Sequence, residues 1–243
     1  GDEVIHSGGS GSFCEEIVAN ELAVLPKPPA LSFEAAAGIT ITYLTSYHAL
    51  VQRANIQPGE TLLVLGAAGG VGSTAVELGK ALGATVIAAA SSDDKLALCE
   101  DLGADHTINY STESVKDRVK ELTGGRGVDV VYDPVGGDFS EPAVRSMGWN
   151  GRYLVIGFAS GPIPSIPLNL TLLKGCAIVG VFWGRFTMEE AEVHQANIAT
   201  LWQWFEEGRI KPVITDLFPI DEYEAAYAAM MERRAKGKVI LTL

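Results

Sequence analysis

A glycine-rich turn is the part of this sequence whose residue types and spacing are best suited to chemistry. Gly66, Gly69 and Gly72 form a GxxGxxG pattern that follows the apolar run Thr61–Leu65 and opens an Ala-, Val- and Leu-rich segment. A strand, a tight turn and a helix in this order let backbone N–H groups approach a pyrophosphate at the positive end of the helix. A plain turn that needs small residues only for packing is the alternative. With its flanking elements, the pattern favours dinucleotide binding.

The residues after the next strand bear on which dinucleotide would bind. An Asp or Glu about 20 residues after the turn usually holds the ribose of NAD, but here the second strand ends at Ala90 without an acid. Ser92 and Lys95 follow, and a hydroxyl with a cation suits a 2′-phosphate. Alternatively, Ser92 only caps a helix, Lys95 is a solvated charge, and the two aspartates between them disfavour a phosphate. The residues favour NADP and leave NAD open.

The elements that must position these residues form a regular alternation. Six short apolar runs are separated by helical segments, which is typical of a parallel sheet covered on both faces. These runs are Thr61–Leu65, Ala84–Ala90, His106–Asn109, Val128–Tyr132, Gly151–Ile156 and Ala177–Phe182. The pattern predicts an α/β fold with a doubly wound, parallel, six-stranded sheet of the Rossmann type.

The flanking segments predict further elements. Residues 1–30 are expected to form short strands and turns, and helices are expected from Ser32 to Ala54, interrupted at Gly38. After the sheet, we expect helices over Glu189–Glu207 and Asp221–Arg234, and a final strand over Val239–Leu243.

Composition narrows the class of protein. The 243 residues include 18 Lys and Arg against 30 Asp and Glu, a formal net charge of −12, and no basic block stands out. We therefore expect neither a nucleic-acid nor a membrane partner, and an anionic ligand would need a local binding device. The three cysteines, Cys14, Cys99 and Cys176, are few and far apart, which suits a reducing cytoplasm rather than a disulfide framework.

Several further motifs carry a family resemblance over the whole chain. With the glycine-rich turn, they resemble medium-chain dehydrogenase/reductases, and more narrowly the NADPH:quinone oxidoreductase (zeta-crystallin-like) branch and its quinone oxidoreductase-like proteins. The motifs are Pro58-Gly59-Glu60, Leu102-Gly103-Ala104-Asp105-His106, Ile108-Asn109-Tyr110, Asp133-Pro134-Val135-Gly136-Gly137, Trp149-Asn150-Gly151-Arg152, Ile156-Gly157-Phe158-Ala159-Ser160-Gly161, Phe182-Trp183-Gly184-Arg185 and Gly237-Lys238-Val239.

The resemblance implies a domain organisation. Residues 1–42 would be the remnant of a GroES-like, β-rich catalytic domain, residues 43–181 the Rossmann NADP-binding domain, and residues 182–243 the return to the catalytic domain. The first residue is Gly, and roughly 80 residues of a typical member would precede it. That missing part would hold one wall of the substrate site, so this chain alone is expected to bind nucleotide but to turn over poorly.

Matching motifs also imply cofactor-binding residues. Gly69, Gly70 and Val71 would contact the pyrophosphate through their backbone, while Ser92 and Lys95 would reach the adenosine 2′-phosphate. Tyr110 would lie at the same end, and Thr45, Gly157 and Phe158 would lie by the nicotinamide. From the residues alone, Thr45 is equally an ordinary helix residue that bonds to its own backbone, and Tyr110 an ordinary strand aromatic.

No metal is expected in this chain. In the zinc-dependent alcohol-dehydrogenase branch a cysteine stands four residues before the position of Thr45, and here that residue is Ile41. Four histidines lack the spacing of zinc ligands, and they are His6, His48, His106 and His194.

The activity implied by the resemblance is zinc-independent hydride transfer from NADPH to a quinone or an activated enone. No catalytic side chain is assigned, because a quinone that accepts hydride gives a delocalised oxyanion. Tyr43, Phe158 and Trp183 are candidates for the pocket walls or, equally, for core packing. An enoyl-thioester or enone reductase and a nucleotide-binding protein without turnover are the alternatives. The apolar run Ala177–Phe182 would be an exposed sheet edge, which favours a homodimer.

Overall fold

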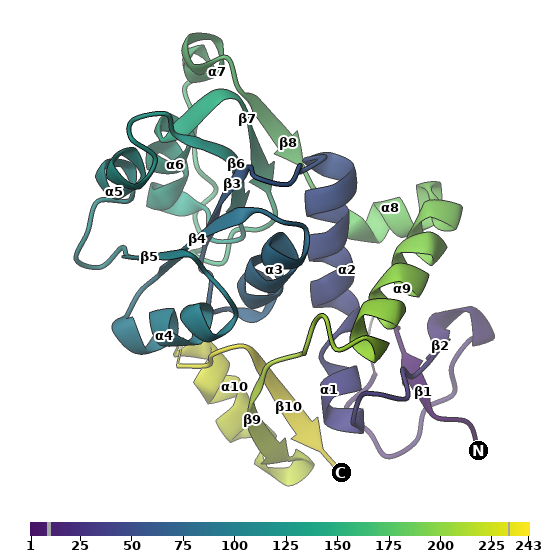
Figure 1. The fold of residues 1–243 in the computed structure, drawn as a ribbon. Helices are drawn as coiled ribbons and strands as arrows, with labels where there is room; N and C mark the ends of the chain where they lie inside the picture. The colour runs from purple at the N-terminus through teal and green to yellow at the C-terminus, as the bar shows by residue number, and fades with distance from the viewer. Residues whose placement is uncertain (9–10, 233) are drawn as a thin grey trace.

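The computed structural model describes residues 1–8, 11–232 and 234–243, and a six-stranded parallel sheet forms its centre (Figure 1). The strand order is β5-β4-β3-β6-β7-β8, so the chain winds outward from β3 in both directions and the order reverses between β3 and β6. This is the Rossmann arrangement that the alternation predicts. The strands are β3 Thr61–Leu65, β4 Thr85–Ala90, β5 His106–Asn109, β6 Val128–Asp133, β7 Met147–Val155 and β8 Ala177–Gly180.

Helices cover both faces of this sheet, because its central strands carry apolar residues on both sides. Leu62 and Val64 of β3 face a core cluster shared with α2, α3, α4 and α9. Leu63 and Leu65 face a second cluster shared with α5, α6 and α7. The helices are α2 Thr40–His48, α3 Gly70–Ala81, α4 Asp93–Asp101, α5 Val115–Leu122, α6 Ser140–Arg145, α7 Asn169–Lys174 and α9 Ala191–Glu206.

Two small two-stranded sheets lie below the central sheet in Figure 1, where both ends of the chain also lie. Strands β1 (Val4–His6) and β2 (Val24–Pro26) pair antiparallel, whereas β9 (Ile214–Pro219) and β10 (Lys238–Thr242) pair parallel. The remaining helices are α1 Phe33–Ala37, α8 Trp183–Glu189 and α10 Tyr223–Met231. The backbone N–H of Gly237 donates to the carbonyl of Ala68 at 2.8 Å, which ties the return segment to the glycine-rich turn.

Several local predictions are confirmed and others are wrong. Ser32 caps α1 by accepting from the N–H of Ala35, and the helix pair is interrupted at Gly38 as expected. The helix expected over Glu189–Glu207 is confirmed as α9, which runs from Ala191 to Glu206, and a separate helix, α8, ends just before it. No Gly or Pro separates α8 from α9, so the local sequence gives no signal for the boundary between them. The last helix ends at Met231, before the expected Arg234. Four elements were not predicted, namely α6, α7, α8 and β9.

Two histidine rings, His48 on α2 and His194 on α9, pack against aromatic side chains of α8. The His48 ring stacks on Phe186 with centroids 3.8 Å apart, and its Nδ1 lies 3.2 Å from Gln52 Oε1. His194 meets the Trp183 indole edge to face at 5.7 Å. Burial lowers the pKa of both rings, because the apolar surroundings disfavour the charged form.

We predict that the fold loses stability as the pH falls. A folded-state pKa below the unfolded value of about 6.5 means that the unfolded chain takes up the proton first, so this stabilisation is present above that pH and lost below it. Glu77, whose pKa is raised by burial, acts in the opposite direction. The measurement is therefore the urea midpoint of wild type and His48→Phe at each pH. The wild type should lose more stability on acidification than the variant, and parallel curves would contradict the prediction.

Candidate functional site

The glycine-rich turn joins β3 to α3 at the carboxyl edge of the sheet. The N–H of Gly69 donates to Gly66 O at 2.9 Å, which closes the turn, and Gly66 itself has a φ of +58°. A Cβ at Gly72 would lie 2.2 Å from Gly66 O, so only glycine allows this approach of helix to strand. In the described part of the chain, nothing accepts from the N–H groups of Gly70 and Val71. These two N–H groups, at the positive end of α3, are available to an anion.

Lys238 lies beside this turn, although it is 168 positions from Gly70 in the sequence. Its Cγ is 3.3 Å from where a Cβ of Gly38 would be, and its Cδ is 3.4 Å from where a Cβ of Gly70 would be. The two glycines thus leave a slot for the lysine side chain. Burial lowers the pKa of its ammonium, and no hydrogen bond or ion pair joins that ammonium to another residue that the structure describes.

A desolvated cation at the positive end of a helix is costly unless an anion neutralises it. Lys238 and the first turn of α3 together therefore fit a pyrophosphate, and we assign Lys238 to the candidate site. Sequence reasoning missed this role. The Gly237-Lys238-Val239 motif was visible, but nothing local links it to Gly70.

The residues predicted for the adenosine end gather after β4 and β5. Ser92 and Lys95 begin α4, and the Lys95 ammonium donates to Ser91 Oγ at 3.2 Å, just beyond the end of β4. Tyr110 follows β5, donates its N–H to Ala90 O at 3.1 Å, and packs its ring on Phe139 with centroids 4.5 Å apart. The structure therefore brings Ser92, Lys95 and Tyr110 to neighbouring strand ends.

The two aspartates that disfavour a phosphate at this end already have partners. Asp93 accepts from Asn109 Nδ2 at 2.7 Å, and Asp94 forms an ion pair of 2.7 Å with Lys236. The Lys236 ammonium, together with the Ser92 hydroxyl, lowers the pKa of Asp94 to about 2. Lys236 thus adds a second cation at this end, contributed by the return segment, and reduces the repulsion that the aspartates would exert on a phosphate.

Thr45 lies on α2, where that helix packs against the first turn of α3. The next residue, Ser46, is completely buried and its hydroxyl bonds to Val71 O at 3.2 Å. The same hydroxyl lies 2.8 Å from Thr74 Oγ1 and 2.7 Å from the Tyr132 hydroxyl. This buried chain of hydroxyls fixes α2 against the phosphate turn, and Thr45, the residue before Ser46, is partly exposed.

Gly157 and Phe158 follow β7 on the other side of the order reversal. The Gly157 N–H donates to Asp133 O at 3.3 Å, and the Phe158 side chain is 40% exposed. Eight of the nine predicted cofactor residues thus follow strands at the carboxyl edge, at separate strand ends, whereas Thr45 lies on α2. The residues after β4 and β5 are on one side of the phosphate turn, and those after β7 are on the other.

Of the three candidate wall residues, Tyr43 belongs to the packing between α2, α3 and α9. It is 3% exposed, its hydroxyl donates to Glu77 Oε2 at 2.6 Å, and its ring meets Phe205 edge to face. Tyr43 is therefore excluded as a pocket wall. Trp183 packs against His194 at the start of α8. Phe158 is the one of the three that remains exposed beside the candidate site.

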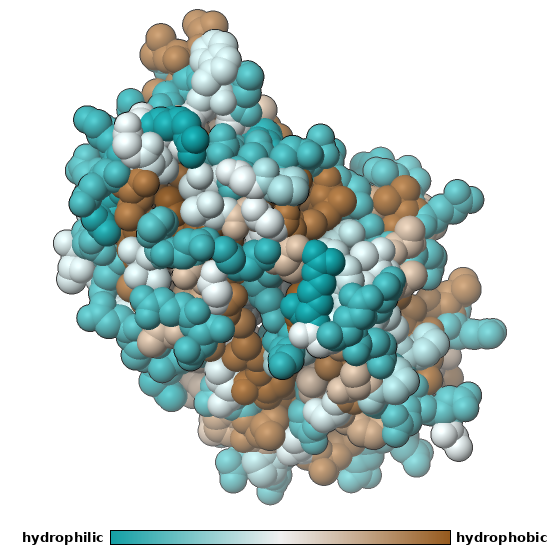
Figure 2. All heavy atoms as spheres, in the orientation of Figure 1, coloured by the Kyte–Doolittle hydropathy of each residue, from teal (hydrophilic) through white to brown (hydrophobic). Residues whose placement is uncertain are grey.

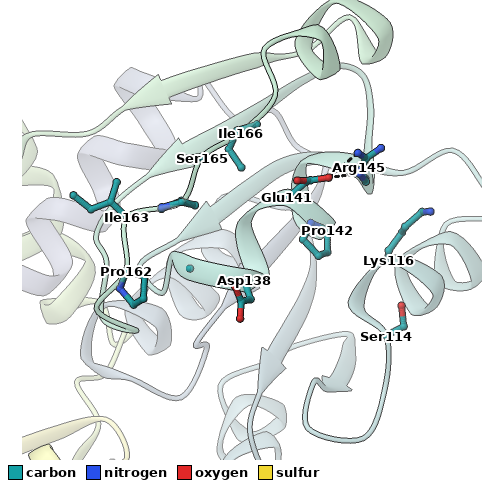
Figure 3. A pocket seen from close by; sticks show the side chains of 12 residues that line it. Ser114, Lys116, Asp138, Glu141, Pro142, Arg145, Pro162, Ile163, Ser165 and Ile166 are labelled. Carbon is teal, nitrogen blue, oxygen red and sulfur yellow. Dashed lines mark hydrogen bonds and ion pairs between the residues drawn. The ribbon is translucent and has the colours of Figure 1, made fainter.

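A cavity of about 530 Å³ lies nearby between α5, α6 and the loop 162–166 (Figure 3). Arg145 and Glu141 on its wall form an ion pair of 2.6 Å. None of the predicted cofactor residues lines this cavity, so the candidate site is defined by the strand ends and not by this cavity.

Comparison with known proteins identifies the family. The pattern of a family described as zinc-binding dehydrogenase matches residues 70–205. Quinone oxidoreductase-like protein 2 of Bos taurus is 40% identical over 100% of this chain and 70% of its own length. This chain belongs to the zinc-binding dehydrogenase family, in its quinone oxidoreductase-like branch.

Other members of this family extend the comparison. The quinone oxidoreductase of Thermus thermophilus, whose structures include a complex with NADPH, superposes with a TM-score of 0.87 at 34% identity over 99% of this chain and 76% of that one. The 2-haloacrylate reductase of Burkholderia sp is 31% identical over 95% of this chain and 70% of its own length. Membership of this family supports an NAD(P)H-dependent oxidoreductase.

The family description includes zinc, but the side chains present do not fit a zinc site. Within residues 1–8, 11–232 and 234–243, no three His, Cys, Asp or Glu side chains are grouped so that they could hold a metal ion. No step proposed below therefore involves zinc. Among the described helices, none is long and apolar enough to cross a membrane.

Proposed function

We propose that this chain transfers a hydride from NADPH to a quinone or an activated enone. The observation that carries the proposal is the half-buried Lys238 side chain, whose methylene groups lie between Gly38 and Gly70 at the N-terminus of α3. Two sources of positive charge converge there in a protein whose net charge is −12. A dinucleotide pyrophosphate provides the neutralising anion at this position of a doubly wound sheet.

Each part of the chain then has a defined task. The N–H groups of Gly70 and Val71 hold the pyrophosphate together with Lys238. The N–H of Gly69 already donates to Gly66 O, so the contribution of Gly69 is that it has no side chain to block the pyrophosphate. Residues 43–181 form the cofactor domain, and residues 1–42 and 182–243 belong to the catalytic domain. At the adenosine end the 2′-phosphate is bound by Ser92 and Lys95, and Tyr110 lies beside the same end. At the nicotinamide end the ring is placed by Thr45, Gly157 and Phe158.

When bound, the cofactor supplies the hydride, and the protein orients it and excludes water. No proton donor is needed for a quinone, because the charge that arrives with the hydride is delocalised over the reduced ring. The similarity to a 2-haloacrylate reductase supports an activated alkene as the second candidate acceptor. A protonated side chain would then be required for the carbanion.

Direct titration tests the proposed function. NADPH should bind the chain, and loss of NADPH absorbance should follow the addition of a 1,4-benzoquinone and, in a parallel series, an α,β-unsaturated ketone. Faster oxidation with the quinone identifies the acceptor as a quinone, and faster oxidation with the ketone favours the second candidate. If NADPH binds and neither acceptor is reduced, the chain is a nucleotide-binding protein under these conditions. Absence of NADPH binding would contradict the proposal itself.

We further propose that two copies pair through β8. This strand is the outer edge of the sheet, and its Ile178 side chain is 38% exposed. Apolar side chains also gather on the adjacent α7, at the top of Figure 2, where Leu172 and Leu173 are 79% and 70% exposed. An open apolar edge favours pairing with an identical edge. Light scattering should give a dimer mass for wild type and a monomer mass for Ile178→Lys, and a monomeric wild type would contradict the proposal.

A further inference from the structure

A buried carboxylate at the end of β6 has no role in the function proposed above. Asp133 is 1% exposed, and its two oxygens accept four hydrogen bonds. Oδ1 accepts from the N–H groups of Val135 and Gly136 at 2.7 and 2.8 Å. Oδ2 accepts from the Ser140 hydroxyl at 2.9 Å and from the Tyr153 hydroxyl. Such a carboxylate is saturated with donors and closed to solvent, so it can position other groups but cannot take a proton from a substrate.

These four donors come from three elements, so Asp133 fixes how those elements meet. Val135 and Gly136 are in the turn after β6, Ser140 begins α6, and Tyr153 lies in β7. Burial and the negative charge of Asp133 both raise the pKa of the Tyr153 hydroxyl, which therefore remains a donor. Loss of one donor would loosen the turn after β6 against both α6 and β7.

The turn after β6 is itself bonded to the turn after β7. The N–H of Ala159 donates to Pro134 O at 3.0 Å, and the N–H of Ser160 donates to Val135 O at 2.9 Å. Gly136 has a φ of +70°, and a Cβ there would lie 2.9 Å from the Phe158 ring. The two turns, residues 134–137 and 157–160, therefore form one hydrogen-bonded unit held by Asp133.

This unit lies on the side of the phosphate turn away from the adenosine residues. Val135 Cγ2 is 2.8 Å from where a Cβ of Gly66 would be, so the unit touches the phosphate turn directly. In a doubly wound sheet the pyrophosphate lies at the first strand and the adenosine ribose at the second. Here these strands are β3 and β4, and the remaining half of a dinucleotide must extend over β6 and β7.

We infer that Asp133, with Ser140 and Tyr153, positions the nicotinamide half of the cofactor without touching it. The four hydrogen bonds set the place of the two turns, and the turns form the surface on which the nicotinamide half rests. The adenosine half depends on Ser92, Lys95 and Tyr110, which follow β4 and β5 on the other side of the phosphate turn. This inference rests on the proposed binding of NADPH.

A matched pair of variants tests it. Tyr153→Phe removes a buried hydroxyl that donates to Asp133, and Tyr43→Phe removes a buried hydroxyl that donates to Glu77 at 2.6 Å. Both lose a tyrosine–carboxylate hydrogen bond in the core, so both should lose thermal stability to a comparable extent. Only Tyr153 is connected to the turns at the nicotinamide side.

Two ligands separate the halves of the site. Adenosine 2′,5′-bisphosphate probes the adenosine half alone, and NADPH probes both halves. Tyr153→Phe should bind the bisphosphate like wild type and NADPH roughly three- to tenfold more weakly, the effect of one typical net hydrogen bond. Tyr43→Phe should leave the ratio of the two affinities unchanged. Ser140→Ala, a smaller change, should lower NADPH affinity selectively as well, which protects the test if Tyr153→Phe does not fold.

The outcomes are distinguishable. A selective loss of NADPH affinity in Tyr153→Phe and Ser140→Ala supports the inference. An equal loss for both ligands, no loss for either, or the same change of ratio in Tyr43→Phe overturns it. If wild type binds neither ligand, the proposed function fails, and that failure is visible before any variant is made.

Discussion

Replacing Lys238 by Met is expected to weaken the binding of NADPH and NADH alike, by roughly 10- to 100-fold. A hydrogen bond to a charged group contributes about 1.5–3 kcal/mol, and about 1.4 kcal/mol corresponds to a factor of ten. Both cofactors carry the pyrophosphate, so both should lose the same contact. Met keeps the length of the side chain and fills the slot between Gly38 and Gly70. Isothermal titration of both cofactors measures the effect.

Stability and pH distinguish this role from a structural one. Removal of this half-buried ammonium should leave the unfolding free energy nearly unchanged, because no described residue forms an ion pair with it. Burial lowers the pKa of Lys238, so wild-type affinity should begin to fall at a pH below the usual lysine range, near about 10.4. Lys238→Met should lack that decline. Lys120→Met, an exposed lysine on α5, is the control and should bind normally. A destabilised Lys238→Met with unchanged affinity would refute the assignment.

Replacing Lys95 by Ala is expected to weaken the binding of NADPH by roughly 10- to 100-fold and to leave the binding of NADH nearly unchanged. β4 ends at Ala90 without an acid, so nothing there accepts from a ribose 2′-hydroxyl. The Lys95 ammonium lies 3.2 Å from Ser91 Oγ, immediately beyond this strand. Asp94, the nearest carboxylate in sequence, is paired with Lys236 and repels a 2′-phosphate less than a solvated aspartate would.

The two cofactors serve as each other's control in this measurement. A loss confined to NADPH assigns Lys95 to the 2′-phosphate. If Lys95→Ala weakens the binding of both cofactors equally, the lysine acts through the fold of α4. If the variant binds both cofactors as wild type does, Lys95 is a surface charge and the preference for NADP over NAD must come from other residues. Together, Lys238→Met and Lys95→Ala separate the pyrophosphate contact from the 2′-phosphate contact.

The strands and the phosphate turn could be predicted because their signals are local. Every residue of β3 is buried, and this produces the short apolar run Thr61–Leu65 that the sequence displays. Gly66, Gly69 and Gly72 are required by a turn that closes within seven residues. The short helices α6 and α7 escaped prediction because six residues are too few to show a helical period.

Side-chain roles proved harder to predict than elements. Tyr43 follows a helical pattern that is compatible with either a pocket wall or the core. Its contact with Glu77 decides for the core, and that contact exists only because α2 packs on α3. Likewise, the two aspartates after Ser92 disfavour a bound phosphate when the sequence is considered alone. In the structure, Lys236 from the return segment forms an ion pair with Asp94 and reduces that repulsion.

The sequence by itself determined the doubly wound sheet, the position of the phosphate turn and the residues at each strand end. These follow from the periodicity of apolar residues and from glycine spacing, which act over a few positions. Only the tertiary structure decided that Lys238 lies in the slot between Gly38 and Gly70, and that Asp133 joins two turns and α6. Those contacts depend on how segments far apart in the chain pack together, and local sequence patterns do not predict that packing.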